Sequence, residues 1–538
     1  MLCGMLAGNF YFSLFARLDA FGLIGPDEPR YASVAREMAE SGDWVTPRLN
    51  GEPWFEKPVL YYWSAAVAFR LLGVSEFSAR LPSAIAALLA AGALAWLAWR
   101  LYGAPAALAF LLTFPTCVGV FAFARAATTD MPFSAALALA MLAAFQVIRG
   151  SQADSDAPSP LNRVLWQMLF GALLGVAALA KGPAAVVLGG GSVALWALAS
   201  GRWKQSFRLA HPFAILAFCI VALPWYVLCA LRNADFVQVF LISHNVARFL
   251  TPVFQHEQPF WFFAPVLLLG LAPWSALLAG LARDARAAWR DPRWKDSPGF
   301  FFACWAIFPF LFFSASRSKL PGYILPIFAP LVLLLVRSLA RAIEEESARA
   351  RWLCVSVGLT LVALAASAGH WLDRLPPESS IGSHGELIAW TLTVCAFGLL
   401  ITALAWCRRC WLAMFLAAVL MASLVAGVAR RIAPRLDPDL SSRTAAELLA
   451  AEAKGSEGIA VFELHRAWHY GLNFYFHREL PKWEPATEPT AASRPQLLVT
   501  SAAGLDALRR SGAPHVVLHT VSRQAIIVRL GSVQDAPE

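Results

Sequence analysis

The chain has 538 residues, of which 58% are hydrophobic and only 15% are charged. Soluble domains carry about 25% charged residues, so the composition excludes an ordinary soluble protein for most of the length. The net charge of +9 does not indicate nucleic-acid binding, because the Lys and Arg residues lie mostly in short loops between apolar runs, where they reflect membrane topology.

Long apolar runs fill residues 1–430, whereas residues 431–538 have the composition of a soluble domain. Many runs reach the roughly 20 residues needed to cross about 30 Å of hydrocarbon. Backbone groups in lipid must be satisfied within the segment, which favours helices. We therefore predict an all-α polytopic membrane domain of about thirteen transmembrane helices, near residues 1–18, 78–99, 104–124, 129–149, 164–180, 183–200, 208–231, 259–281, 300–315, 322–340, 352–371, 386–406 and 410–429.

Basic residues are concentrated in every second loop between these helices, from Arg100 to Arg409. Positively charged loops remain in the cytoplasm, so we expect a cytoplasmic N-terminus. The first apolar run lacks a small-residue cleavage pattern, which argues against a signal peptide. The segments that then face the periplasm or the cell exterior are 19–77, 232–258, 315–321 and the tail after residue 430.

The soluble segment, residues 431–538, alternates strand-like and helix-like stretches, which predicts a small periplasmic α/β domain. We expect strands at Ile459–Leu464, Leu497–Thr500, His515–Leu518 and Ala525–Leu530, and helices at Ser442–Ala453 and Ala502–Arg510. The chain shows no Gly-rich phosphate loop and no nucleotide-binding fold, so we expect no nucleotide cofactor.

The first outer loop, residues 19–77, is the most informative stretch. Pro29 suits the first turn of a helix, with Asp27 near its N-cap. A second helix along the membrane surface is expected to begin near Pro58, where aromatic residues favour the interface. The first helix would be amphipathic and lie along the membrane surface, because one of its faces is apolar; that face consists of Tyr31, Val34, Ala35 and Met38.

Each charged side chain of this loop has an ordinary interpretation on its own: a solvated helix cap for Asp27 and Glu28, and a cation that reaches to the interface for Lys57. Their number on one short loop at one membrane face favours a binding or catalytic site instead. The candidate residues of the loop are Asp27, Glu28, Arg30, Tyr31, Glu56 and Lys57.

Further polar residues fall at the same predicted membrane face. One acid stands at the outer end of a span, one lysine stands between two spans, and a histidine and an arginine lie about one helical turn apart. Charges at membrane depth are costly, so the default interpretation is functional. These additional candidates are Asp130, Lys181, His244, Arg248, Lys319 and Tyr323.

Cations that converge near the outer interface suit a phosphate or pyrophosphate group, because Arg offers a bidentate fork and Lys a point charge. Carboxylates suit a positively charged partner, a metal ion or a hydroxyl group that must lose a proton. A phosphate site without a nucleotide fold, set in a membrane, indicates a lipid-linked phosphate as substrate.

Several separated motifs resemble those of one known family. They span most of residues 20–330 in order and at matching topology, and they resemble the bacterial aminoarabinose transferases, which are related to the protein O-mannosyltransferases and belong to the GT-C membrane glycosyltransferases. One departure is Trp54, where these transferases tend to have Tyr. The motifs are Asp27-Glu-Pro-Arg-Tyr31, Ser41-Gly-Asp-Trp-Val-Thr-Pro47, Phe55-Glu-Lys-Pro58, Leu179-Ala-Lys-Gly-Pro183, His244-Asn-x-x-Arg-Phe249 and Ser318-Lys-Leu-Pro-x-Tyr323.

The resemblance implies a GT-C fold of membrane helices, juxtamembrane helices and a periplasmic domain. It also implies an inverting transfer from an undecaprenyl-phosphate sugar to a lipid A, protein or glycan acceptor at the inner membrane. The implied catalytic carboxylates are Asp27 and Asp130, and the implied ligands of a divalent metal, zinc or magnesium, are Glu56 and His244. The implied phosphate binders are Tyr31, Lys57, Arg248 and Tyr323, and we place Glu28, Arg30, Lys181 and Lys319 with them as substrate-binding candidates.

Two questions stay open at this point. The motifs do not separate lipid A modification from transfer of another sugar to protein or glycan. A transporter or flippase of lipid-linked sugars is the alternative outside the enzymes. Transporters place ionisable residues near the bilayer midplane, often in inverted repeats, whereas here the charges gather at one face and no repeat is visible. This pattern favours an enzyme.

Overall fold

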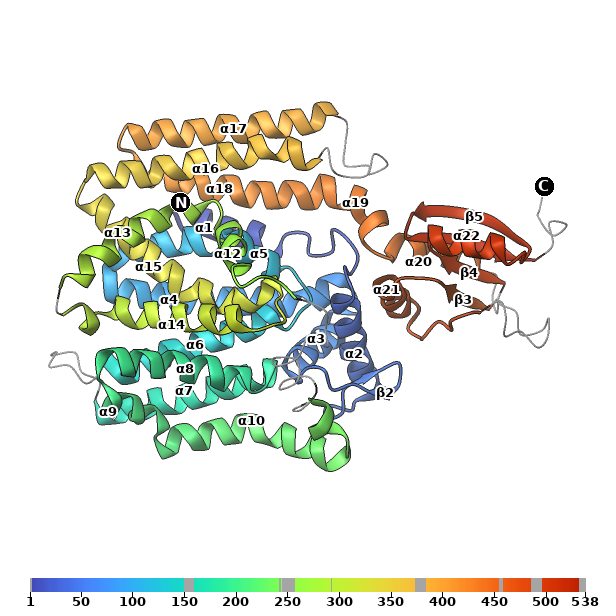
Figure 1. Ribbon diagram of the computed structural model, residues 1–538, viewed down its shortest axis with the longest axis horizontal. Coiled ribbons are helices and arrows are strands. Elements are labelled where there is room, and N and C mark those ends of the chain that lie inside the picture. The colour runs from blue at the N-terminus through green and yellow to red at the C-terminus, as the bar shows by residue number, and fades with distance from the viewer. Residues whose placement is uncertain are drawn as a thin grey trace.

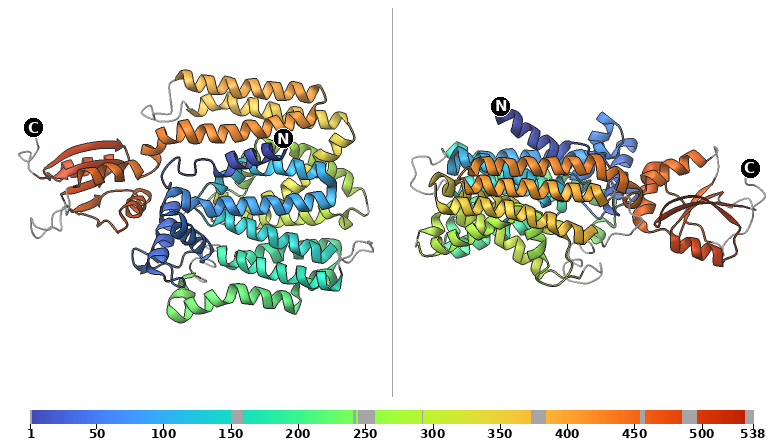
Figure 2. Two further views of the ribbon diagram at one scale, coloured as in Figure 1. Left: turned by 180° about the vertical axis from the view of Figure 1, so that it is seen from behind. Right: turned by 90° about the horizontal axis from the view of Figure 1, so that it is seen from above.

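The computed structural model describes residues 2–149, 159–240, 243, 257–291, 293–372, 384–453, 458–484 and 496–531. Long helices that run roughly parallel form a bundle, and a small sheet with its own helices lies beyond one end of that bundle (Figure 1). The views from behind and from above show the same arrangement (Figure 2). The predicted fold class, a polytopic helical region followed by a small α/β region, is confirmed.

Nine helices among the described residues are long and apolar enough to cross a membrane, and the bent pair Phe263–Leu271 (α12) with Trp274–Trp289 makes ten. Two shorter apolar helices are α1 (Leu2–Phe10) and α8 (Ala184–Ser200). The chain is therefore a multi-pass membrane protein. The long helices are α4 (Glu76–Thr113), α6 (Asp130–Arg149), α7 (Pro160–Lys181), α10 (Pro212–Arg232), α14 (Pro298–Ala315), α15 (Leu325–Glu344), α16 (Ala348–Leu372), α17 (His384–Trp406) and α18 (Cys410–Gly427).

Helix α4 covers most of two predicted spans. It is broken at Gly103, whose φ of 83° lies in the left-handed region that glycine adopts without steric cost. A short 3-10 turn and α5 (Val118–Ala124) complete the second of these spans. With this division, each of the thirteen predicted spans coincides with a helical segment among the described residues.

Two helices form the centre of the bundle. In the segments Asp130–Arg149 and Pro321–Glu344, 89% of the most apolar stretch is buried, against 11% for Gly385–Trp406. A helix that is apolar all round suits either the centre of a membrane protein or its lipid face. The central helices α6 and α15 matter for the site, because Asp130 begins the first and Tyr323 lies in the turn before the second.

The first long loop contains helix α2 (Asp27–Ser41), a two-stranded hairpin of β1 (Arg48–Leu49) and β2 (Glu52–Pro53), and helix α3 (Leu60–Leu72). Helix α2 ends at Gly42, which is left-handed and donates its N–H to the carbonyl of Met38. The predicted apolar face of α2 is buried. That face packs in one cluster with aromatic side chains of α3 and with Phe474 from the end of the chain.

The C-terminal region holds a four-stranded sheet in the order β3-β4-β6-β5. Strands β3 and β4 are parallel, and the other neighbouring pairs are antiparallel. All four predicted strands and both predicted helices are present, and two helices, α19 and α21, were not predicted. The elements are α19 (Ala433–Leu440), α20 (Arg443–Glu452), β3 (Ile459–Phe462), α21 (Arg466–Phe476), β4 (Leu497–Thr500), α22 (Ala502–Arg510), β5 (His515–Ser522) and β6 (Ala525–Leu530).

Candidate functional site

Arg30, in the first turns of α2, gathers two candidate carboxylates of the first loop. Its NH2 nitrogen lies 2.5 Å from Oδ1 of Asp27 and 3.0 Å from Oε2 of Glu56. The side chain of Arg30 is 10% exposed, whereas that of Asp27 is 49% exposed. One nitrogen thus bridges two acids from separate segments, and Asp27 is the acid that remains accessible.

Three aromatic rings surround the guanidinium of Arg30. Its central carbon lies 5.4 Å from the ring centre of Tyr31, 5.3 Å from Trp54 and 5.8 Å from Tyr470. Burial alone would lower the pKa of Arg30, but the electrostatic interactions with Tyr31, Glu56 and Asp27 together outweigh it and raise the pKa. We call Asp27, Arg30 and Glu56, with these three rings, the Arg30 cluster.

Tyr31 also belongs to a buried aromatic group. Its ring centre lies 6.2 Å from that of Tyr61 and 6.1 Å from that of Tyr62. Burial, reinforced by the negative charge of Asp27, raises the pKa of the Tyr31 phenol well above its ordinary value. The Tyr31 hydroxyl is therefore protonated at neutral pH.

The carboxylate of Glu28, a predicted substrate-binding residue, is buried and already has four donors. Arg80 donates Nε to Oε1 at 3.1 Å and NH2 to Oε2 at 2.7 Å. The backbone N–H groups of Ala127 and Ile24 donate to the same two oxygens at 2.6 and 2.8 Å. Glu28 is therefore a structural acid that holds parts of the chain together.

Arg80 completes this network. Its side chain is 1% exposed, and it also donates to the backbone carbonyls of Leu18, Phe21 and Gly22. Glu28 lies next to Asp27, and Ala127 lies three residues before Asp130. The Glu28–Arg80 pair thus ties the start of α2 to the start of α6.

The second candidate acid, Asp130, pairs with Lys181 at the end of α7. The Nζ of Lys181 lies 2.5 Å from Oδ1 of Asp130. The same Nζ lies 5.3 Å from the ring centre of Phe133 and 5.7 Å from that of Tyr323. The structure thus brings three predicted site residues, Asp130, Lys181 and Tyr323, together from three elements.

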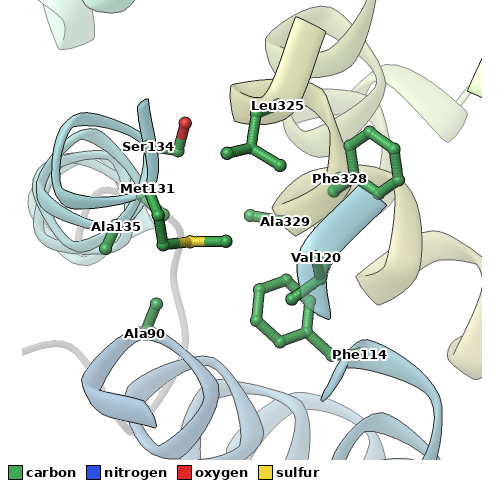
Figure 3. Close-up of a pocket in the computed structure, with 10 residues that line it drawn as sticks. Ala90, Phe114, Val120, Met131, Ser134, Ala135, Leu325, Phe328 and Ala329 are labelled. Carbon is green, nitrogen blue, oxygen red and sulfur yellow. The ribbon is translucent and has the colours of Figure 1, made fainter. Parts of the chain in front are cut away.

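A small apolar cavity lies beside the first turns of α6 (Figure 3). Met131 and Ser134 of α6 face Val120 of α5 and Phe328 of α15 across it. Its volume is about 10 Å³, which is room for about one water molecule. The cavity is a packing void next to Asp130 and is too small for a sugar or a phosphate.

The two remaining candidate lysines, Lys319 and Lys57, have different surroundings. Lys319 is buried, and its Nζ donates to the backbone carbonyl of Gln258 at 3.0 Å and to that of Ser316. Backbone carbonyls thus accept from two of the three N–H donors of Lys319, and its predicted role in substrate binding stays a prediction. Lys57 is partly buried and directly follows Glu56 of the Arg30 cluster.

Two predicted residues, His244 and Arg248, lie outside the described residues. The metal site predicted at Glu56 and His244 stays a prediction for this reason. Glu56 itself is paired with Arg30, and a cation at this position competes with a metal ion for the same oxygens. Within the described ranges, no three His, Cys, Asp or Glu side chains are grouped as a metal site would need.

Sequence reasoning missed two residues of the site, Arg80 and Tyr470. Arg80 could have been found, because it is an arginine near the start of an apolar span, where a charge indicates a partner. Tyr470 could not, because it lies in the soluble segment and nothing in its neighbourhood connects it with the first loop.

The bundle, the juxtamembrane helices of the first loop and the charge clusters at their junction define the GT-C class of membrane glycosyltransferase fold. The family model "Dolichyl-phosphate-mannose-protein mannosyltransferase" matches residues 10–240. Two solved structures of ArnT from Cupriavidus metallidurans cover 100% of this chain and 99% of their own. The structure bound to undecaprenyl phosphate has a TM-score of 0.78 at 26% identity, and the apo structure has 0.77 at 24%.

Curated relatives carry the name undecaprenyl phosphate-alpha-4-amino-4-deoxy-L-arabinose arabinosyl transferase. The Edwardsiella ictaluri protein is 35% identical over 322 residues, which are 60% of this chain and 56% of that protein. A Sodalis glossinidius protein is 37% identical over 317 residues, 58% and 55% of the two chains. The chain thus matches just over half the length of these relatives. The comparisons confirm the resemblance, and the chain is a relative of the bacterial aminoarabinose transferases.

Proposed function

We propose that the chain is an inverting glycosyltransferase of the bacterial inner membrane. It transfers the sugar of an undecaprenyl-phosphate-linked donor to lipid A. The observation that carries the proposal is the Arg30 cluster, in which Arg30 joins the accessible carboxylate of Asp27 to Glu56, the residue before partly buried Lys57. The Asp130–Lys181 pair, which Glu28 ties to the same loop, supports it. The names of the curated relatives and the undecaprenyl phosphate in the related solved structure supply the substrate class.

We further propose that both clusters face the periplasm. The N-terminus is then cytoplasmic, and residues 431–538 form a periplasmic domain that follows the transmembrane domain of residues 1–430. The support is the distribution of basic residues, since loops rich in Lys and Arg remain on the cytoplasmic side. Labelling of single introduced cysteines at Ser151 and Asp506 with a membrane-impermeant thiol reagent, in a cysteine-free background, tests this. Reaction at position 151 in intact cells would contradict the orientation.

In the proposed reaction, an acceptor oxygen attacks the anomeric carbon of the sugar as the bond to the lipid phosphate breaks. A hydroxyl acceptor must lose its proton, and Asp27 is placed to take it. A phosphate oxygen is already an anion, and Asp27 then orients the acceptor and sugar. Lys57, Arg248 and Tyr323 would stabilise the negative charge that develops on the departing lipid phosphate. Lys181 would assist beside Asp130.

Mass spectrometry of lipid A and of envelope glycoproteins, with and without the gene, tests the proposal. We expect loss of a sugar-sized mass from lipid A when the gene is deleted. Loss from a glycoprotein or a glycan would instead assign a different acceptor. If the protein moves the lipid-linked sugar across the membrane and no acceptor is covalently changed, the protein is a flippase and the proposed enzyme activity is wrong.

Lys57→Ala is expected to lower transfer by about 10²–10³-fold, which is typical for removal of a group that stabilises developing negative charge. Lys57→Arg should restore part of the rate, because it keeps the charge but not the geometry. The assay is release of undecaprenyl phosphate from a synthetic donor by the purified protein. Lys204→Ala, at an exposed lysine in the short α9 (Trp203–Ser206), is the control and should leave the rate unchanged. A wild-type transfer rate for Lys57→Ala would contradict the assignment of Lys57 to the phosphate-binding site.

Gly322→Ala is expected to impair transfer by moving Asp130. A Cβ atom at Gly322 would lie 2.8 Å from Oδ1 of Asp130 and 2.8 Å from the ring of Phe123, both closer than real Cβ contacts allow. Gly190→Ala is the matched control, since nothing lies within 4 Å of its Cβ position. The comparison of kcat for the two variants, with unfolding temperatures measured in parallel, checks the prediction. Equal kcat values would show that Asp130 can move freely or has no part in the reaction.

A further inference from the structure

The C-terminal region does not simply follow the membrane bundle, because its helix α21 packs on α2 of the first loop (Figure 1). Arg36 of α2 is buried, and its NH1 donates to the backbone carbonyl of Phe474 at 2.5 Å. The guanidinium of Arg36 also lies 5.7 Å from the ring centre of Phe474. Farther along, Nδ1 of His477 lies 3.4 Å from Glu40.

A second set of contacts fixes the same region to the segment before α2. The hydroxyl of Tyr475 donates to Glu76 at 2.8 Å and accepts the N–H of Leu23 at 3.3 Å. The N–H of Gly22 donates to Asp437 at 2.6 Å. A Cβ at Gly22 would lie 2.3 Å from Oγ of Ser441, so the two segments approach so closely that only glycine fits there.

These contacts hold Tyr470 against Arg30 of the first loop. Tyr470 and Phe474 lie one turn apart on the same face of α21. Phe474 meets Arg36, and the ring of Tyr470 lies over Arg30 at 5.8 Å. Tyr470 therefore reaches the Arg30 cluster from a segment more than 400 residues away. Its helix is held in place by the hydrogen bonds of Phe474 and Tyr475, about one turn further along.

The aromatic rings around Arg30 contribute to holding it, because one of its N–H groups makes no hydrogen bond to the residues that the structure describes. The Nε of Arg30 is buried and has no hydrogen-bond partner within the described ranges. The NH2 group of the same guanidinium carries the contacts to Asp27 and Glu56, and NH1 donates to Oε1 of Glu56 at 3.4 Å. Aromatic faces attract a guanidinium and exclude water, which strengthens the ion pairs that remain.

We propose that Tyr470 is a positioning residue that closes the Arg30 cluster and thereby fixes the carboxylates of Asp27 and Glu56 for the transfer reaction. The inference rests on the proposed function. It makes the C-terminal region a structural part of the active site. Tyr470 acts through Arg30 and needs its ring, not its hydroxyl group.

The test compares purified full-length variants with a synthetic undecaprenyl-phosphate sugar donor. Tyr470→Leu keeps bulk but removes the ring, and we expect kcat to fall by about 2–30-fold, as loss of one partly buried cation–π contact implies, while KM for the donor changes little. Tyr470→Phe should retain the wild-type rate. Phe476→Leu is the matched control, because it removes a ring from the same helix that packs in the C-terminal cluster.

A second readout separates positioning from a general loss of structure. If Tyr470 acts through Arg30 alone, the loss in Tyr470→Leu falls on kcat at an unchanged KM for the donor, and Tyr470→Phe recovers the wild-type kcat. Phe476→Leu should leave kcat unchanged, at an unfolding temperature similar to that of Tyr470→Leu. Absence of any transfer by the wild-type protein would defeat the proposed function. Active wild type with an equally active Tyr470→Leu, or with an equal loss of kcat in Phe476→Leu, would defeat this inference.

Discussion

Replacement of Asp27 by Asn is expected to lower kcat by about 10²–10⁴-fold, the usual contribution of a positioned acid–base group, while the protein stays folded. Asparagine keeps the size of the side chain and an oxygen that can accept from Arg30, so the Arg30 cluster loses charge but not packing. Asp27 is 49% exposed, and this accessibility is what allows it to meet an acceptor. The rate is measured as transfer from a synthetic donor, with the unfolding temperature as the check on folding.

Asp19→Asn provides the matched control for this experiment. Asp19 lies on the same loop, is half exposed and pairs with Arg17 at 3.6 Å, so its loss removes one acid from the same face without touching the Arg30 cluster. We expect the wild-type rate. A fully active Asp27→Asn, or an equal loss in both variants, would contradict the catalytic assignment.

Arg80→Leu is expected to produce the largest loss of stability, about 3–5 kcal/mol in the free energy of unfolding, because it leaves the buried Glu28 without its counter-ion. The measurement is reversible unfolding of the purified protein in detergent micelles. Arg341→Leu is the control, since its pair with Glu345 is exposed and such pairs contribute at most about 1 kcal/mol.

The double variant Glu28→Leu/Arg80→Leu distinguishes a simple ion pair from a network. A buried pair can often be replaced by apolar residues without loss. Here the backbone carbonyls of Leu18, Phe21 and Gly22 would lose their donor, and each unsatisfied group costs about 1–3 kcal/mol. We therefore expect the double variant to remain destabilised. Recovery of wild-type stability would mean that water satisfies these carbonyls.

The membrane helices could be predicted from the sequence because lipid leaves so few choices. A long apolar run must be a helix, whatever surrounds it, and all thirteen expected spans correspond to helical segments. The apolar face of α2 could be predicted for a similar reason, since Tyr31, Val34 and Met38 share one side of a 3.6-residue repeat. The strands and helices of residues 431–538 could also be predicted, because each depends on the pattern of its own neighbouring residues.

The partners of the polar side chains could not be predicted, because they depend on packing between distant segments. Glu28 and Asp27 are neighbours in the sequence, yet Glu28 is buried against Arg80 and Asp27 is half exposed beside Arg30. A charged pattern of this kind gives no indication of which partner each acid has. Lys319 belongs to a motif that suggested phosphate binding, but its ammonium group is held by carbonyls that no pattern reveals.

The bonds that join Gly22, Leu23 and Arg36 to the C-terminal region span 415, 452 and 438 residues of sequence. Ribosomes add about 5–20 residues per second, so the first loop emerges roughly 20–90 s before its partners exist. During translation, the nascent chain therefore lacks an assembled Arg30 cluster even when most helices have been inserted. Premature termination shortly before α21 would yield a membrane-embedded product whose Arg30 lacks the ring of Tyr470, and full activity would begin only after the last segment has docked.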